Sequence, residues 1–313
     1  MGTLRRSQQG AVDAAGVAVE QSLSGDGSKL EPVKGYIFLG FLILSIVLGI
    51  AMLLTLVIDS IIQGAPFLRW NPLVTGVPSS IPSEAGLWVA IVGTFWVIGL
   101  MIITVVPLAV GAAIYLEEYA DTDRWYNRVI ELNIQNLAAV PSIVFGILGL
   151  GLIVRGGLSL GPVVYAGSLT LALLVLPTVI LASREALRAV PPSHRLGAMA
   201  LGSTKWQAIW RNVLPAAIPG IATGSILATA RAIGETAPLL LIGATVFITF
   251  TPEGPLSEGY TTLPVQIFSW ATRPQEEFRT LSAASIVVLL AVLLIINAFA
   301  IWIRNHYTKK QQQ

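Results

Sequence analysis

Six long apolar runs dominate the sequence, and each is long enough to cross the hydrocarbon core of a lipid bilayer. They cover about residues 36–62, 87–116, 134–154, 162–183, 213–248 and 281–303. A core of about 30 Å requires about 20 apolar residues in a helix, and a helix satisfies its own backbone groups where water is absent. The sequence therefore predicts an all-α, polytopic membrane protein with six transmembrane helices. A composition of 54% hydrophobic and 12% charged residues agrees with that class.

The basic residues outside these runs lie mostly on one predicted side of the membrane. Fourteen fall on the side of both termini and four on the opposite side. Because loops rich in Lys and Arg stay in the cytoplasm, both termini are predicted to be cytoplasmic. Residues 1–35 form a predicted disordered cytoplasmic tail, residues 36–303 the membrane domain, and residues 304–313 a short cytoplasmic C-terminal tail.

Two ionisable residues, Arg231 and Glu235, interrupt the fifth run. The twelve residues from Pro219 to Arg231, at about 1.5 Å each, place the arginine near the middle of the bilayer. Charges at that depth are costly, and they are found facing a water-filled path or another protein element. At about 100° per residue, both side chains share one helical face with three small residues: Gly220, Gly224 and Ala228.

An arginine in this position suits a small oxyanion, because its planar guanidinium offers paired N–H donors and stays charged. Glu235 is predicted to neutralise Arg231 at rest and to release it when an anion arrives. The structural alternative is a salt bridge that only orients helices. A proton relay through Glu235 is disfavoured, since no second buried acid or histidine continues a chain.

The segment of about 184–213, between the fourth and fifth runs, is predicted to be a structured cytoplasmic loop with two short helices. Ser193 is predicted to cap the first helix, and Gly202 to end it in a left-handed conformation. Thr204 with Gln207 fits a capping box that starts the second helix. That helix carries residues at i, i+3, i+4 and i+7 that form one predicted apolar stripe: Trp206, Ile209, Trp210 and Val213. The pattern suits either an amphipathic helix at the membrane interface or a docking element for a cytoplasmic partner.

The remaining polar residues offer little chemistry of their own. Cysteine is absent, and the two histidines, His194 and His306, do not suggest a His-based metal site. No phosphate-cradling G-x-x-x-x-G-K-[ST] motif occurs. The chain is therefore predicted to be no enzyme and to hold no cofactor. Four acidic residues after the second run are predicted to form a solvated surface: Glu117, Glu118, Asp121 and Asp123.

A longer pattern runs through the loop. The run Arg195-Leu-Gly-Ala-Met-Ala-Leu-Gly202 is followed, nine residues later, by Asn212-Val-Leu-Pro215. This spacing resembles the EAA loop of bacterial ABC importer permeases, although Leu196 and Asn212 replace the glutamate and isoleucine of that pattern. The resemblance implies that the loop forms coupling helices that sit in a cleft of a separate ATPase subunit. The residues expected to couple to the ATPase are Ala198, Gly202, Thr204, Lys205, Trp206, Leu214 and Pro215.

Three other stretches carry a more specific likeness: Asn133–Gly146, Ala230–Leu240 and Leu263–Ala271. They resemble phosphate importer permeases of the PstA type, and the likeness extends over about residues 36–303. It implies a permease subunit of an ATP-driven importer that carries inorganic phosphate across the bacterial cytoplasmic (inner) membrane. By the same resemblance, Arg231 and Glu235 lie in the phosphate path.

The resemblance also implies partners. They are a sister permease of the PstC type, an ATPase dimer of the PstB type that would bind ATP and Mg²⁺, and a periplasmic phosphate-binding protein of the PstS type. Membrane lipid surrounds the chain, and no nucleic acid is expected. Because one arginine attracts any small oxyanion, sulfate, molybdate or phosphonate is an alternative cargo. A secondary transporter or channel is a second alternative, which the structured loop and the lack of a detectable internal repeat disfavour.

Overall fold

The computed structural model of the chain describes residues 30–69, 72–121, 124–245 and 247–311. Within these ranges the chain is helical and contains no β-strand beyond one isolated antiparallel bridge, between Val163 and Glu258. The chain divides into two units, Met1–Asp59 and Ser60–Gln313. Most of the predicted N-terminal tail lies outside the described residues. The all-α fold class is confirmed.

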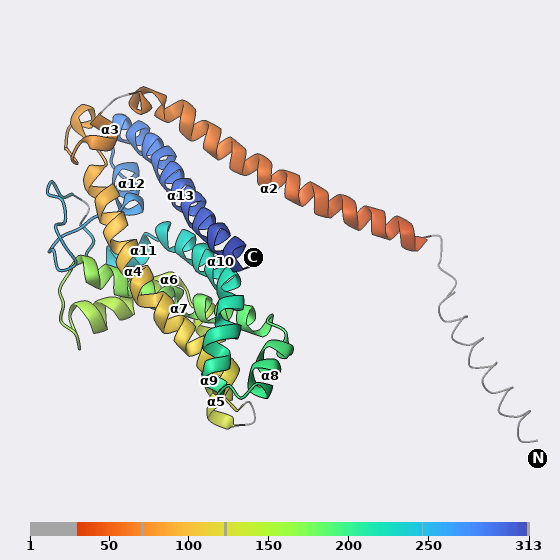
Figure 1. Cartoon of the computed structure of the whole chain (residues 1–313). Coiled ribbons are helices and arrows are strands. Elements are labelled where there is room, and N and C mark those ends of the chain that lie inside the picture. The colour runs from red at the N-terminus through yellow and green to blue at the C-terminus, as the bar shows by residue number, and fades with distance from the viewer. Residues whose placement is uncertain (1–29, 70–71, 122–123, 246, 312–313) are drawn as a thin grey trace, which may run out of the picture. The chain divides into compact units, whose positions relative to one another are not determined.

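The first unit contains most of α2 (Leu30–Leu68), which carries the first apolar run (Figure 1). Its stretch Gly35–Leu68 is long and apolar enough to cross a membrane. Two polar side chains in this stretch bond within the helix: the hydroxyls of Ser45 and Thr55 donate to the carbonyl oxygens of Phe41 and Ala51. The helix thereby meets the requirement that polar groups in lipid find partners inside the protein.

The second unit is organised around a lengthwise pair of helices, α4 (Trp88–Ile114) and α7 (Val164–Arg188). An apolar cluster fills the space between them, and it includes the fully buried side chains of Val97, Met101 and Leu171. α10 (Leu214–Ile233) packs on α7, and α13 (Glu276–Gln311) packs on α10 (Figure 1). α13 continues as a helix through residues 304–311, the segment predicted as a C-terminal tail.

Small residues bring α10 into direct contact with α7, as the glycine spacing predicts. A Cβ added to Gly220 would lie 2.7 Å from the Cβ of Ala186, and one added to Gly224 would collide with Ala182. Ala228, one turn further on, is buried in the same contact region. Helices in lipid associate through such close packing, because burial of apolar surface brings no gain there.

The third apolar run is not a single straight helix. α5 (Trp125–Ala138) ends before Pro141, and α6 (Ser142–Leu148) continues into the π-helical segment η3 (Gly149–Val154). The two parts are bent by 109°. Pro141 explains the break, since proline lacks the N–H that a continuing helix needs. The described residues therefore contain five long candidate spans, or six when the bent pair counts as one.

The fifth run begins and ends earlier than predicted. One helical stretch, Lys205–Ile233, is formed by α9 (Lys205–Ala208), η4 (Ile209–Val213) and α10. The predicted span of 213–248 is wrong beyond Ile233, because the chain turns at Gly234 and forms the short helix α11 (Ala237–Leu241). Gly243, with φ of +98°, then ends α11 and opens a loop.

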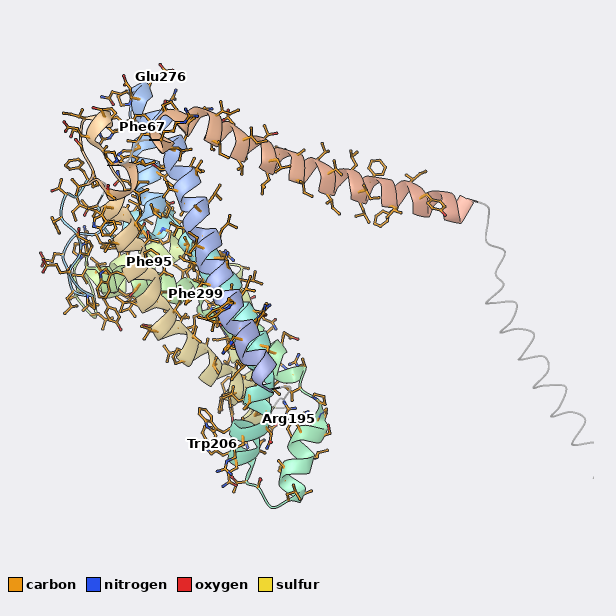
Figure 2. All side chains as sticks on the ribbon, turned by 45° about the horizontal axis from the view of Figure 1, so that its top comes forward. Phe67, Phe95, Arg195, Trp206, Glu276 and Phe299 are labelled. Carbon is orange, nitrogen blue, oxygen red and sulfur yellow. The ribbon has the colours of Figure 1, made fainter. Side chains whose placement is uncertain are left out.

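The two ends of the second unit differ in character. α8 (Pro192–Ala200), α9 and α5 lie at one end, here called the α8 end (Figure 1). The opposite end, here called the α12 end, carries α3 (Pro72–Thr75), η1 (Pro82–Glu84) and α12 (Leu263–Ala271). Figure 2 shows Arg195 and Trp206 at the α8 end, and Phe67 and Glu276 at the α12 end.

The turns of the α8 end follow the sequence signals with one exception. Gly202 has φ of +85° and ends α8 in the predicted left-handed conformation. The capping box is present: the Gln207 N–H donates to Thr204 Oγ1 at 3.3 Å, and the Thr204 N–H donates to Gln207 Oε1 at 3.0 Å. Ser193 is not the N-cap, because α8 begins at Pro192 and its N-cap is Pro191.

Gly93→Ala is expected to lower the free energy of unfolding by about 1–3 kcal/mol, because the added Cβ would collide with the carbonyl oxygen of Thr261. Gly99→Ala in the same helix meets no atom within 4 Å. It is expected to raise stability by up to about 1 kcal/mol, since alanine favours helix more than glycine does. Thermal unfolding of the detergent-solubilised protein measures both, and equal melting temperatures would contradict the close approach of α4 and Thr261.

Thr204→Ala removes the side-chain acceptor of the capping box, whose loss costs about 1 kcal/mol. The Gln207 amide is therefore expected to exchange its proton about fivefold faster. Ser193→Ala is the matched control, because Ser193 makes no cap hydrogen bond and its replacement is expected to leave amide exchange in α8 unchanged. Site-resolved hydrogen exchange distinguishes the two, and an unchanged rate at Gln207 would show that the cap is not used in solution.

Candidate functional site

Arg231 lies at the end of a helix instead of inside one. It occupies the last turn of α10, which ends at Ile233. Its side chain is 55% exposed in this chain. A cation in the last turn of a helix is favoured by the negative pole of the helix dipole, typically by about 0.3–1 kcal/mol.

Glu235 is not on the same helical face as Arg231, because it follows the helix end at Gly234. The prediction that the two side chains share one helical face is therefore wrong, because only Arg231 lies in the helix. Their proximity is nevertheless present: Arg231 Nε lies 3.7 Å from Glu235 Oε1, and the Glu235 side chain is only 18% exposed. The Glu235 N–H donates to the Ala232 carbonyl oxygen at 3.2 Å, which folds the carboxylate back toward the helix end.

At 3.7 Å the contact is an ion pair longer than a hydrogen bond. The Arg231 side chain is more than half exposed, whereas the Glu235 side chain is mostly buried.

Two of the sequence stretches singled out above meet beside this pair. Gly146 of α6 lies against α11, where an added Cβ would be 2.7 Å from the Cα of Pro238. α6 and α11 pack on each other along this contact. The bend of the third run at Pro141 thus brings residues 142–148 next to the chain that follows Glu235.

At the α8 end, the loop of 184–213 presents exposed apolar side chains. Leu201, in the turn after α8, is 90% exposed, and Leu196 and Met199 of α8 are also exposed. Trp206 and Trp210 stack on each other at 5.5 Å between ring centroids and are both more than half exposed. An exposed apolar group of this kind marks a surface that binds another protein or lipid.

The predicted apolar stripe of the second loop helix is split in two. Ile209 and Val213 are buried, whereas Trp206 and Trp210 face outward. The π-helical segment η4 inserts a wider turn here, which shifts residues around the helix axis relative to the α-helical spacing assumed from sequence.

The residues expected to couple to a partner do not all share one environment. Thr204 and Lys205 are exposed, and the Lys205 Nζ lies 5.0 Å above the Tyr119 ring. Ala198 is half-buried and accepts a hydrogen bond from the Ser203 N–H. Leu214 and Pro215 are half-buried at the start of α10. The exposed part of this predicted set is therefore centred on Gly202 to Trp206.

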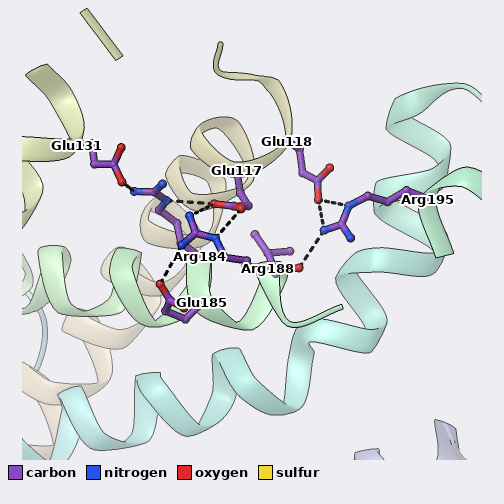
Figure 3. Close-up of polar contacts among 8 residues, drawn as sticks. Glu117, Glu118, Glu131, Arg184, Glu185, Arg188 and Arg195 are labelled. Atoms are coloured by element: carbon purple, nitrogen blue, oxygen red, sulfur yellow. Dashed lines mark hydrogen bonds and ion pairs between the residues drawn. The ribbon is translucent and has the colours of Figure 1, made fainter. Parts of the chain in front are cut away.

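Behind this surface lies an ion-pair network that the sequence did not reveal (Figure 3). Glu117 of the π-helical turn η2 (Tyr115–Tyr119) accepts two hydrogen bonds from Arg188, both at 3.0 Å. Arg184 donates to Glu131 of α5 at 2.9 Å. Glu118, which is almost fully buried, accepts from Arg195 Nε at 2.8 Å and from Nη2 at 2.6 Å.

The network corrects the prediction that these acids form a solvated surface. Glu117 and Glu118 join the end of α4 to α7 and α8, and only Asp121 of the described acids in that group lies on the surface, where it pairs with Arg124. One signal was available in the sequence: the acids and the arginines of 184–195 fall on the same predicted side of the membrane. In the part of the chain that the structure describes, no three His, Asp or Glu residues are placed to hold a metal ion.

Residues 105–312 match the family of binding-protein-dependent transport system inner membrane components. The phosphate transport system permease protein PstA of Haemophilus influenzae is 32% identical over 265 residues, which cover 84% of this chain and 91% of that protein. The phosphate transport system permease protein PstA 1 of Mycobacterium tuberculosis H37Rv is 35% identical over 248 residues, covering 78% and 77%.

A solved structure shares the fold at low identity. It is a bacterial alginate ABC transporter in complex with an alginate pentasaccharide-bound periplasmic protein. The likeness has a TM-score of 0.63 at 15% identity, over 87% of this chain and 95% of that chain. With its apolar spans and with two thirds of its length matched, this chain is a multi-pass membrane protein and belongs to the family of binding-protein-dependent transport system inner membrane components.

Proposed function

We propose that this chain is the permease subunit of an ATP-driven importer that carries inorganic phosphate into the bacterial cytoplasm. The observation that carries the proposal is the match of most of the chain to relatives named as phosphate transport permeases. The chemistry at the end of α10 is compatible with it, since an exposed guanidinium in a membrane protein attracts a small oxyanion.

The α8 end is proposed to face the cytoplasm, together with both termini. The supporting observation is the excess of basic residues on that side, including Arg184, Arg188, Arg195, Lys205 and Arg211. The α12 end then faces the periplasm, where a phosphate-binding protein of the PstS type would deliver the anion.

Arg231 is proposed to supply the attracting charge of the path, and Glu235 to occupy the guanidinium when no anion is present. The exposure of Arg231 supports this role, because more than half of its side chain is left open in this chain. A sister permease of the PstC type would provide the other wall of the path. The contact with Glu235, at 3.7 Å, is longer than a hydrogen bond, and this supports exchange of the carboxylate for phosphate.

The exposed surface around Leu201 and Trp206 is proposed to dock on an ATPase dimer of the PstB type, which would bind ATP and Mg²⁺. An apolar side chain that is 90% exposed at a tight turn is unfavourable in water, and covering it with a partner stabilises the complex.

The same architecture could carry sulfate, molybdate or phosphonate as an alternative cargo, because the Arg231 guanidinium attracts any of these anions.

Arg231→Gln is expected to lower ATP-dependent uptake of radiolabelled phosphate by at least about tenfold, because a hydrogen bond from a charged donor is worth about 1.5–3 kcal/mol. Vesicles that contain the complete transporter provide the measurement. Arg124→Gln is the matched control, since Arg124 forms an exposed surface ion pair with Asp121 and should transport normally. Normal uptake by the Arg231→Gln variant would show that Arg231 has a structural role only. Inhibition of phosphate uptake by sulfate would favour a different oxyanion as the cargo.

Leu201→Glu is expected to reduce the amount of ATPase that co-purifies with this chain by about tenfold, as the loss of a central apolar contact does in protein interfaces. Leu256→Glu makes the same change at an exposed position of the loop at the α12 end, and it should leave ATPase retention unchanged. Equal retention by the two variants would remove Leu201 from the docking surface.

A further inference from the structure

We propose that the Arg195–Glu118 pair is the positioning contact that carries motion of α8 to α4. The inference rests on the proposed function, in which an ATPase moves α8. It concerns residues outside the predicted coupling set and outside the predicted substrate path.

α8 contacts α9 and η4, but it has no comparable packing on α4. None of its residues is fully buried, so no packed apolar face joins it to α4. A pocket of about 450 Å³ lies beside it, lined on one side by Leu196 and Met199 and on the other by Glu118 and Ile209. Loose packing of this kind transmits displacement poorly, because side chains bordering a void can shift without moving their neighbours.

Arg195 bridges this gap with four hydrogen bonds. Two go to one oxygen of Glu118, at 2.8 and 2.6 Å. Two go to the carbonyl oxygens of Val190, at 2.8 Å, and Leu187, at 2.9 Å. Leu187 lies in the last turn of α7, whose carbonyls lack the donors of a continuing helix, and Val190 follows the end of that helix. One guanidinium thus holds α8, the end of α7 and the end of α4 in a single arrangement.

The chain connections explain why the Glu118 contact matters most for α4. α8 is joined to α7 through Pro191 and to α9 through Gly202, so movement can reach both along the backbone. α4 has no such direct connection to α8. It ends in η2, and Glu118 of η2 meets Arg195 in a nearly buried ion pair. Removing one partner of a buried pair leaves the other charge uncompensated, which makes the contact sensitive to substitution.

The neighbouring pair gives a matched comparison. Arg188 binds Glu117, the residue beside Glu118, with two hydrogen bonds of 3.0 Å. It joins α7 to η2 without contacting α8. Arg188→Gln therefore removes an ion pair from the same network while keeping the Arg195–Glu118 contact intact.

The first test measures phosphate transported per ATP hydrolysed, in vesicles with equal amounts of assembled transporter. Glu118→Gln is expected to lower this ratio by about tenfold or more, within the range of coupling free energies between sites, while ATPase retention is unchanged. Arg195→Lys, which keeps the charge but cannot make the same four bonds, should lower it as well. Arg188→Gln should remain within about twofold of wild type. An unchanged ratio in Glu118→Gln, or an equal loss in Arg188→Gln, would overturn the proposal.

The second test does not depend on the cargo. The chain has no cysteine, so spin labels can be placed at Ser193→Cys in α8 and at Leu108→Cys in α4, both exposed positions outside the proposed docking surface. The label–label distance should stay constant when ATP binds to the complex of the wild-type background, and should change when Glu118→Gln is added. A distance that changes equally in both would overturn the linkage. The two proposals can fail separately. If the distances behave as expected but wild-type vesicles take up no phosphate, phosphate is not the cargo, while the role of the Arg195–Glu118 contact is still supported.

Discussion

The second unit depends on how closely α7 packs against α4 and α10. In lipid, apolar side chains gain nothing by leaving one apolar surrounding for another, so shape decides which helices associate. Gly220 and Gly224 remove side chains where α10 meets Ala182 and Ala186. This contact fixes the rotation of α10, and Arg231, seven residues after Gly224, lies on the same side of the helix beyond this close contact, where its side chain is 55% exposed. The position of the predicted substrate residue is therefore a consequence of packing between small residues about two turns away.

At the α8 end, charge is added to apolar packing. A buried cluster that includes Ile114, Leu187 and Ile209 lies at this end, and arginines from α7 and α8 converge on Glu117 and Glu118. Buried ion pairs add little net stability, because desolvation offsets much of their attraction, but they impose a defined geometry. Such a junction suits a point where parts of the protein must stay aligned while they move, which a tightly packed core would resist.

The end of α10 balances its own charges. Arg231 meets the negative pole of its helix, equivalent to about half an elementary charge, and it also meets Glu235. The guanidinium is therefore nearly compensated at rest, although it is partly open. An anion that displaced Glu235 would find a donor already oriented by the last turn of α10.

The sequence by itself determined the helical membrane class, the apolar spans, the left-handed turn at Gly202 and the capping box at Thr204. Each of these follows from local chemistry: apolar length, backbone conformation or a hydrogen bond between near neighbours. The early end of α10 at Ile233 and the partners of Glu118 were decided only by the tertiary structure. The sequence does not distinguish apolar residues of a long span from those of a short packed helix. Nor does it distinguish a solvated carboxylate from one paired with an arginine 77 positions away. Only the packing of distant segments distinguishes these cases, because it sets which backbone groups and charges lose water.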